Sequence, residues 1–259
     1  MKPSYLAELR AHRYTFLYLV RIYLLLRYQR TALGFLWTLL NPLLTMTVTA
    51  VVFSMVLRIE MRAYAIFLLA GSIPWLCFSN TVLQSVGIFI NNEGLIKKVY
   101  VPKLIFPAAL ATSALLDSVL SACALLLIVI VLGAQLSVHL LFLPVAFVLL
   151  YLFASSVGLL ISVATVYFRD LQYVATHLLQ LAYFLTPVLY PLDLIPPKFH
   201  GLYALNPMVP FVELFRAPIY RNQLPDAAVI VSACVIGVAT LAVALTVFRR
   251  YEDRLVFRL

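Results

Sequence analysis

Side chains able to do chemistry are few in this chain and are scattered along it. The histidines fall in four different segments, as His12, His139, His177 and His200. No Cys/His cluster has the spacing of a metal site, and no G-x-x-x-x-G-K-[ST] phosphate loop occurs. Nothing resembles a serine or cysteine activated by a neighbouring base. We therefore expect no catalysis, and no cofactor, in this chain alone.

Asp117 is the one clear carboxylate inside a long apolar stretch. An ionisable residue within a membrane is costly and points to function, such as proton coupling in a carrier. Alternatively, the carboxyl group is protonated or bonded to a neighbouring serine at a helix interface, since no second acid or buried base occurs at a matching depth. The acidic pair Glu252 and Asp253 near the end of the chain is most simply solvated charge.

Long apolar stretches determine the fold class. Of the 259 residues, 64% are hydrophobic and 11% are charged. A membrane-spanning helix needs about 20 mostly apolar residues, and helices satisfy their own backbone groups in lipid. Six stretches reach this length: Leu33–Leu57, Tyr64–Ile90, Leu104–Leu132, Leu140–Tyr167, Val174–Tyr190 and Ala227–Phe248. The sequence predicts an all-α integral membrane protein of one domain, 1–259, with an interfacial helix (1–30), a six-span region (33–248) and a cytoplasmic tail (249–259).

The net charge of +9 is distributed unevenly about these spans. With six spans, fourteen of the 19 Lys and Arg residues fall on one side: Lys2, Arg10, Arg13, Arg21, Arg27, Arg30, Lys97, Lys98, Lys103, Arg169, Arg249, Arg250, Arg254 and Arg258. The positive-inside rule then predicts that both termini are cytoplasmic. This excess of basic side chains on one side indicates contact with the anionic headgroups of membrane lipids rather than with nucleic acid.

The lead before the first span has an amphipathic pattern. Its apolar part, Tyr14–Leu26, is too short to span, and four arginines share one arc of a helix: Arg10, Arg13, Arg21 and Arg27. This pattern predicts a helix lying on the cytoplasmic surface. Two interpretations stay open: a simple anchor, or one border of a substrate entrance where Arg27 and Arg30 pair with phosphate.

Two loops carry further signals. After the second span, Gly94 and Pro102 bound a short helix with Leu95, Ile96, Val99 and Tyr100 on one face and Lys97 and Lys98 elsewhere. That helix either rests on headgroups or docks a soluble partner. Between Pro191 and Pro225 lie half of the 14 prolines. This stretch predicts a broken, re-entrant hairpin of two short helices on the outer side, in which Glu213 pairs with Arg216.

Five motifs occur in an order typical of one family. They are RYQRTALGFLWTLLNP (Arg27–Pro42), NNEGLIKKVYVPK (Asn91–Lys103), YFRDL (Tyr167–Leu171), TPVLYPLDLIPPKF (Thr186–Phe199) and NPMVPFVELFR (Asn206–Arg216). Together they resemble the membrane subunit of bacterial ABC exporters for lipid-linked polysaccharide, the group that handles O-antigen, capsule and teichoic acid.

The resemblance implies a half-transporter in the bacterial inner membrane. Two copies form the channel, and each binds a P-loop ATPase subunit that uses ATP and Mg²⁺. The resemblance makes Leu95–Pro102 the coupling helix and the Pro191–Tyr220 region the outer gate, with Phe211, Phe215 and Tyr220. It makes the N-terminal helix the element flanking the headgroup entrance.

Aromatic side chains are numerous, with 17 Phe, 15 Tyr and 2 Trp. Sugar rings present apolar C–H faces that pack on aromatic rings, so a lumen for a sliding glycan would be lined by repeated weak contacts. We expect the following residues to face the lumen: Trp37, Trp75, Phe78, Tyr183, Phe184 and Tyr190. The alternatives are a small-molecule or lipid exporter of the same permease type, a proton-coupled carrier using Asp117, and a membrane-bound transferase.

Overall fold

The computed structural model describes residues 11–28, 34, 36–131, 137–199, 201, 203 and 205–259. These residues form helices and no strand, which confirms the all-α membrane class. Four of the helices are long and apolar enough to cross a membrane. They are α4 (Met61–Val86), α7 (Ile105–Val131), α8 (Leu143–Tyr167) and α12 (Ala227–Arg258).

The first and fifth predicted spans differ from these four. Helix α3 (Leu36–Leu57) contains Pro42 and has 22 residues. Helix α9 (Leu171–Leu185) has only 15 residues, or about 22 Å at 1.5 Å per residue, which is shorter than the ~30 Å hydrocarbon layer. The predicted span Val174–Tyr190 therefore continues beyond its helix, and a count of six spanning helices is not confirmed.

Helix α4 lies at the centre of the bundle and contacts α3, α7, α8, α9 and α11. Small residues bring the helices together, as is common in membranes. A Cβ on Gly158 of α8 would lie 2.5 Å from Ser85 Oγ of α4, and one on Gly237 of α12 would lie 3.2 Å from Leu152 of α8. The backbones of α4, α8 and α12 are therefore as close as these glycines allow.

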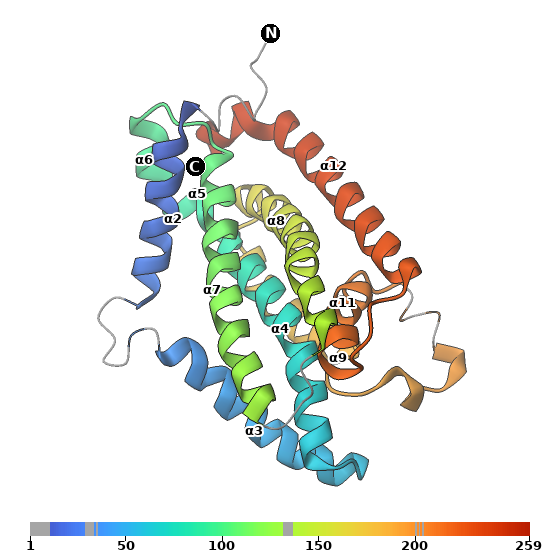
Figure 1. The fold of residues 1–259 in the computed structure, drawn as a ribbon. Coiled ribbons are helices and arrows are strands. Elements are labelled where there is room, and N and C mark those ends of the chain that lie inside the picture. Colours follow the sequence, from blue (N-terminus) through green and yellow to red (C-terminus); the bar gives the residue numbers. More distant parts are fainter. Residues whose placement is uncertain are drawn as a thin grey trace.

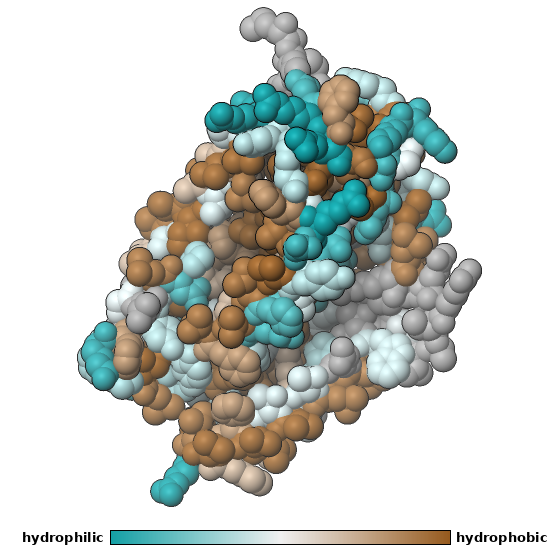
Figure 2. Space-filling view, turned by 180° about the vertical axis from the view of Figure 1, so that it is seen from behind, coloured by the Kyte–Doolittle hydropathy of each residue, from teal (hydrophilic) through white to brown (hydrophobic). Residues whose placement is uncertain are grey.

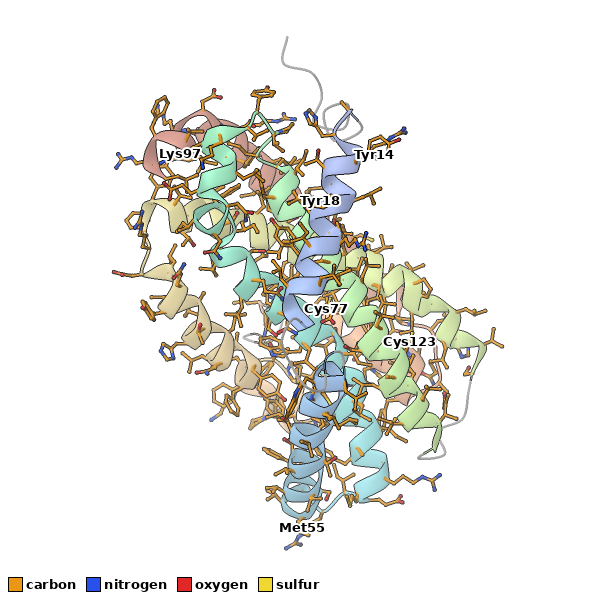
Figure 3. The ribbon with its side chains drawn as sticks, turned by 90° about the vertical axis from the view of Figure 1, so that its left-hand side faces the viewer. Tyr14, Tyr18, Met55, Cys77, Lys97 and Cys123 are labelled. Carbon is orange, nitrogen blue, oxygen red and sulfur yellow. The ribbon has the colours of Figure 1, made fainter. Side chains whose placement is uncertain are left out.

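One end of the molecule holds α6 (Glu93–Lys98), the start of α2 (Arg13–Tyr28) and the C-terminus (Figure 1). In Figure 3, Tyr14 and Lys97 lie at this end and Met55 lies at the other. Helix α2 is amphipathic as predicted, with Arg13 and Arg21 exposed and Leu19 and Val20 buried. It runs alongside α7 instead of lying across the end of the bundle (Figures 1 and 3).

The loop after α4 and the end of the chain both depart from their predicted shapes. The chain bends at Gly87 between α4 and α5 (Ile88–Asn91), and α6 ends at Lys98 because Val99 is extended. Val99 and Tyr100 therefore do not share a helical face with Leu95 and Ile96. Residues 249–258, predicted as part of a cytoplasmic tail, continue α12 as helix.

The proline-rich region is short and broken, as the sequence predicts. Its described helical parts are η2 (Leu192–Leu194), η3 (Pro197–Phe199) and α11 (Met208–Tyr220). The predicted pairing of Glu213 with Arg216 is wrong. Glu213 forms an ion pair with Arg221, whereas Arg216 turns inward and is only 5% exposed.

Arg216 is one of three side chains that hold the non-helical segment after α9. Its Nη2 donates to the carbonyl oxygens of Pro187 at 2.7 Å and Val188 at 3.3 Å. Tyr64 Oη donates to Leu189 O at 2.6 Å, and Asn206 Nδ2 donates to Leu185 O at 3.2 Å. Thr186–Leu189 are buried, and irregular backbone at membrane depth is tolerated only where protein or water satisfies it. Arg216 and Tyr64 supply donors for that purpose, and Asn206 satisfies the last carbonyl of α9 and bonds to Thr186 Oγ1 at 3.0 Å.

Candidate functional site

A groove runs along α9, with α4 as its floor and α3 as its opposite wall. Its middle part is a cavity of about 370 Å³. The residues that line it come from α3, α4 and α9: Pro42, Thr45, Met46, Thr49, Leu68, Ser72, Trp75, Leu76, Ser79, Leu83, Thr176, Leu179, Gln180, Tyr183 and Phe184. Most of these side chains are apolar or aromatic, and hydroxyl groups are interspersed among them.

Three aromatic rings form a continuous set in this middle cavity. The Trp75 and Tyr183 ring centroids are 5.5 Å apart, and those of Tyr183 and Phe184 are 5.7 Å apart. Trp75 is nearly buried, whereas Phe184 is 61% exposed. The three rings thus form an apolar surface that becomes more exposed from Trp75 to Phe184 and that suits the C–H face of a sugar ring. Ser72, Ser79 and Thr176 offer hydroxyl groups for hydrogen bonds.

A second, more polar cavity of about 860 Å³ continues the groove toward α5 and α6. Its described lining residues are Tyr23, Leu26, Asn80, Leu83, Gln84, Val86, Gly87, Ile88, Asn91, Asn92, Leu110, Gln172 and Thr176. Leu83 and Thr176 border both cavities, so the two are continuous. A third cavity of about 450 Å³ lies at the other end of α9 and includes Ala182, Phe199 and Tyr203.

The surface on the α9 side reflects this arrangement. In Figure 2, which views the molecule from behind, hydrophilic side chains extend from the upper end down into an otherwise hydrophobic face. Helix α9 itself is little covered, since Ala175 is its one fully buried residue. Exposed apolar side chains on α9 include Leu178, Leu181 and Leu185. In the single chain the groove is therefore open along one side.

The structure brings together half of the residues predicted to face a lumen. Trp75, Tyr183 and Phe184 line the groove. Phe78 is buried and stacks on Phe153 with centroids 5.2 Å apart, and Tyr190 hydrogen-bonds to Tyr203 at 2.9 Å. Trp37, at the start of α3, is exposed and does not border the three cavities.

The predicted gate residues all lie on α11. Phe211 and Phe215 are fully buried and pack against Phe153 and Phe147 of α8 with centroid distances of 4.7 and 4.8 Å. Tyr220 is 37% exposed and meets the Phe67 ring edge-on. Their rings are part of the protein core in this conformation, so their role as a gate stays a prediction.

The other predicted sites are the phosphate entrance, the coupling helix and Asp117. Arg30 and the side chain of Arg27 fall outside the described residues. In and after α6, Ile96 is buried, Lys97 pairs with Glu93, and Leu95, Lys98, Val99 and Tyr100 are exposed. Asp117 on α7 is 3% exposed and does not border the cavities described above.

Sequence reasoning missed the amide side chains of the groove. Asn80, Gln84 and Asn91 recur at helical spacing along α4 and α5, and Gln172 and Gln180 recur along α9. The signal in the sequence is a set of polar residues four, seven or eight apart within apolar stretches, which is the mark of one polar helix face. A stretch that is long and apolar enough to span a membrane conceals such a stripe, because a few amides hardly change its apolar character.

Comparison with known proteins gives a consistent result over nearly the whole chain. The family model described as ABC-2 type transporter matches residues 14–220. An O-antigen export system permease protein (RfbA) of Myxococcus xanthus is 32% identical over 248 residues, covering 95% of each chain. A protein of the same name from Klebsiella pneumoniae is 27% identical over 88% of each chain. The polysialic acid transport protein KpsM of Escherichia coli is 27% identical over 88% of this chain and 89% of its own.

Proposed function

This chain belongs to the ABC-2 type transporter family, and from that premise we propose that it is the membrane channel subunit of an exporter for lipid-linked polysaccharide. The observation that carries the proposal is the similarity to O-antigen and polysialic acid exporters along almost the full length of the chain. The fold agrees, because apolar helices make up the described part of the chain. The chain is a transport subunit and not an enzyme.

The groove along α9 supports a glycan as cargo. Trp75, Tyr183 and Phe184 offer stacking surfaces, and the cavity next to them offers amides and hydroxyl groups. A polymer that slides needs many weak contacts, and stacking on successive rings provides them without fixing one register. A second copy of the chain would close the open side of the groove, since α9 exposes several apolar side chains. The working channel in this proposal is therefore a homodimer in the bacterial inner membrane.

ATP hydrolysis belongs to a separate subunit in this proposal. The sequence has no phosphate loop, so two copies of a P-loop ATPase would bind the dimer and would hold ATP and Mg²⁺. Helix α6 suits the contact, because Ile96 anchors it to the bundle while Leu95 on the helix and Tyr100 just after it are exposed. Lysines and arginines gather at this end, which would place α6 and both termini in the cytoplasm.

The lipid-linked phosphate would enter beside α2, whose last turn carries Arg27. Arg27 and Arg30 are the candidates, because guanidinium groups bind phosphate with paired, charge-assisted hydrogen bonds. Phe211, Phe215 and Tyr220 would act later, at the outer end, where α11 and the segment after α9 would separate to let the glycan pass.

The proposal can be tested in inverted membrane vesicles that contain the chain and its co-purified ATPase. We expect ATP-dependent accumulation of a radiolabelled lipid-linked glycan inside the vesicles, with loss of accumulation when the Walker lysine of the ATPase is replaced. A proton-coupled carrier would instead accumulate glycan from a pH gradient without ATP, and Asp117→Asn would abolish this. Export of small dyes or lipids without glycan would favour the small-molecule alternative.

A further inference from the structure

The polar cavity at the α6 end of the groove has a chemistry of its own. We call its five amide side chains, Asn80, Gln84, Asn91, Asn92 and Gln172, the carboxamide pocket. We propose that this pocket is a binding site for one or two neutral sugar units, which it recognises by their hydroxyl and acetamido groups before they reach the aromatic part of the groove. The inference rests on the proposed function and adds to it the place where the cargo is selected.

Most of these amides are free to bind a ligand. In the described part of the chain, the side chains of Gln84, Asn91 and Gln172 form no hydrogen bond with protein. Each carboxamide offers two N–H donors and one acceptor oxygen. Asn91 and Gln172 are exposed and Gln84 is half-buried, so these amide groups are accessible to a ligand that enters the cavity.

The amides also converge in space. A Cβ on Gly87 would lie 2.9 Å from Asn91 Nδ2 and 3.5 Å from Gln172 Nε2. The absence of a side chain at Gly87 therefore lets an amide from α5 and an amide from α9 approach the same point. Asn92 is fixed beside them, because its Nδ2 donates to Ile88 O at 2.7 Å and its Oδ1 accepts from Tyr23 Oη at 3.4 Å.

The lining chemistry selects the class of ligand. No described residue that lines the pocket carries a charge, whereas phosphate sites usually have Arg or Lys. Amides suit the mixed donor and acceptor groups of a neutral sugar. The volume of about 860 Å³ falls within the range of about 300–1,000 Å³ that is usual for small-ligand sites.

The pocket also touches α6. Asn92 is the residue that precedes α6, and it lines the cavity. A sugar bound to Asn91 and Asn92 would contact the base of the helix that the proposed function assigns to ATPase docking. A sugar bound in the pocket would therefore lie where it could influence how the partner subunit binds to α6.

The test uses the complex with its ATPase in lipid nanodiscs, free of glycoside detergents. The probe is radiolabelled octyl N-acetyl-β-glucosaminide, with binding measured by scintillation proximity. The variants are Gln84→Met and Gln172→Met, which keep side-chain length but remove the amide. Gly87→Ala keeps every amide but displaces those of Asn91 and Gln172. The matched control is Gln223→Met, the same change on an exposed residue outside the groove.

A neutral hydrogen bond contributes about 1 kcal/mol, or about fivefold in affinity. We expect each Met variant to weaken probe binding about fivefold, the double variant to weaken it about 25-fold, and Gln223→Met to leave it unchanged. Export of lipid-linked glycan by the double variant should show a raised KM with a smaller change in kcat. Sodium pyrophosphate should not compete with the probe.

Unchanged probe binding in the double variant, failure of the wild-type complex to bind the probe, or competition by pyrophosphate would overturn the inference. These outcomes are separable from failure of the proposed function. If the wild type binds the probe through these amides but accumulates no glycan with ATP, the pocket stands and the export function falls. If export proceeds normally in the double variant with unchanged KM, the export function stands and the pocket falls.

Discussion

The buried guanidinium of Arg216 provides the sharpest test of how this fold is held together. It supplies donors to two carbonyl groups of the segment after α9 and lies over the Phe67 ring with Cζ 3.9 Å from the centroid. Gly71 on α4 leaves room for it, because a Cβ there would lie 2.6 Å from Nη2. Replacement by Met, of similar length but without charge or donors, should release the segment from α11.

The size of the effect follows from these contacts. A hydrogen bond from a charged donor contributes about 1.5–3 kcal/mol, and a desolvated cation–π contact contributes about 1–2 kcal/mol. Removing the charge also removes the cost of burying it, which offsets part of the loss. We expect a net destabilisation of about 2 kcal/mol for Arg216→Met. For a chain of this size that is a decrease in Tm of about 5 °C.

The assay is thermal unfolding of the purified protein in one detergent, followed by fluorescence-detected gel filtration. Arg221→Met is the matched control, since Arg221 pairs with Glu213 near the same helix end but is about half exposed, and surface pairs contribute about 0–1 kcal/mol. Gly71→Ala leaves Arg216 in place and should destabilise through displacement of the guanidinium. Equal Tm values for Arg216→Met and Arg221→Met, or no effect of Gly71→Ala, would refute this account of Arg216.

Three further predictions address coupling, transport and pH. Ile96→Asp places a carboxylate at a buried position of α6 and should reduce ATPase co-purification at least tenfold, whereas Lys98→Asp, at an exposed position, should have a smaller effect; equal loss would contradict anchoring by Ile96. Phe184→Leu removes an exposed ring from the groove and should lower the export rate severalfold with little change in Tm, and Phe184→Tyr should restore it. Burial raises the pKa of Tyr23 to about 12, and the hydrogen bond with Asn92 lowers it less. The folded state thus favours the neutral phenol, so the stability it contributes is complete below about pH 10 and is lost as pH rises toward 12. The Tm of Tyr23→Phe, measured by thermal unfolding, should therefore fall less between about pH 10 and pH 12 than the Tm of the wild type.

The class of fold and most helix positions could be predicted because length and hydrophobicity decide them. The predicted Leu104–Leu132 and Leu140–Tyr167 stretches correspond to α7 and α8. The end of α9 could not be found in this way. Residues Thr186–Tyr190 are apolar enough to extend a span, and Pro187 alone does not show whether a helix ends or only bends.

The candidate site could be predicted only in part, because a stretch that is apolar overall conceals a polar stripe. Residue type alone makes Trp75, Tyr183 and Phe184 candidates for the lumen, and the structure places them on the groove. Phe78 is also aromatic and its ring centroid lies 6.0 Å from that of Trp75, but it is buried against Phe153 of α8 instead of bordering the groove. Separating a groove residue from a buried one requires knowing which helices pack on α4, and one sequence does not supply that information.

Arg216 illustrates why a charged residue in such a chain resists interpretation from spacing alone. Its distance of three residues from Glu213 favours a pair on one face of a short helix, within a region predicted as a re-entrant hairpin. Arg216 is instead buried because the carbonyl groups of a non-helical segment in apolar surroundings need hydrogen-bond donors. Pro187 and Val188 lie nearly thirty residues away in sequence, so only the packed structure connects the donor with the carbonyls. In the function proposed above, this segment would separate from α11 when the glycan passes. Moving Arg216 and Tyr64 away from it would expose carbonyl groups that a passing, hydroxyl-rich glycan could satisfy.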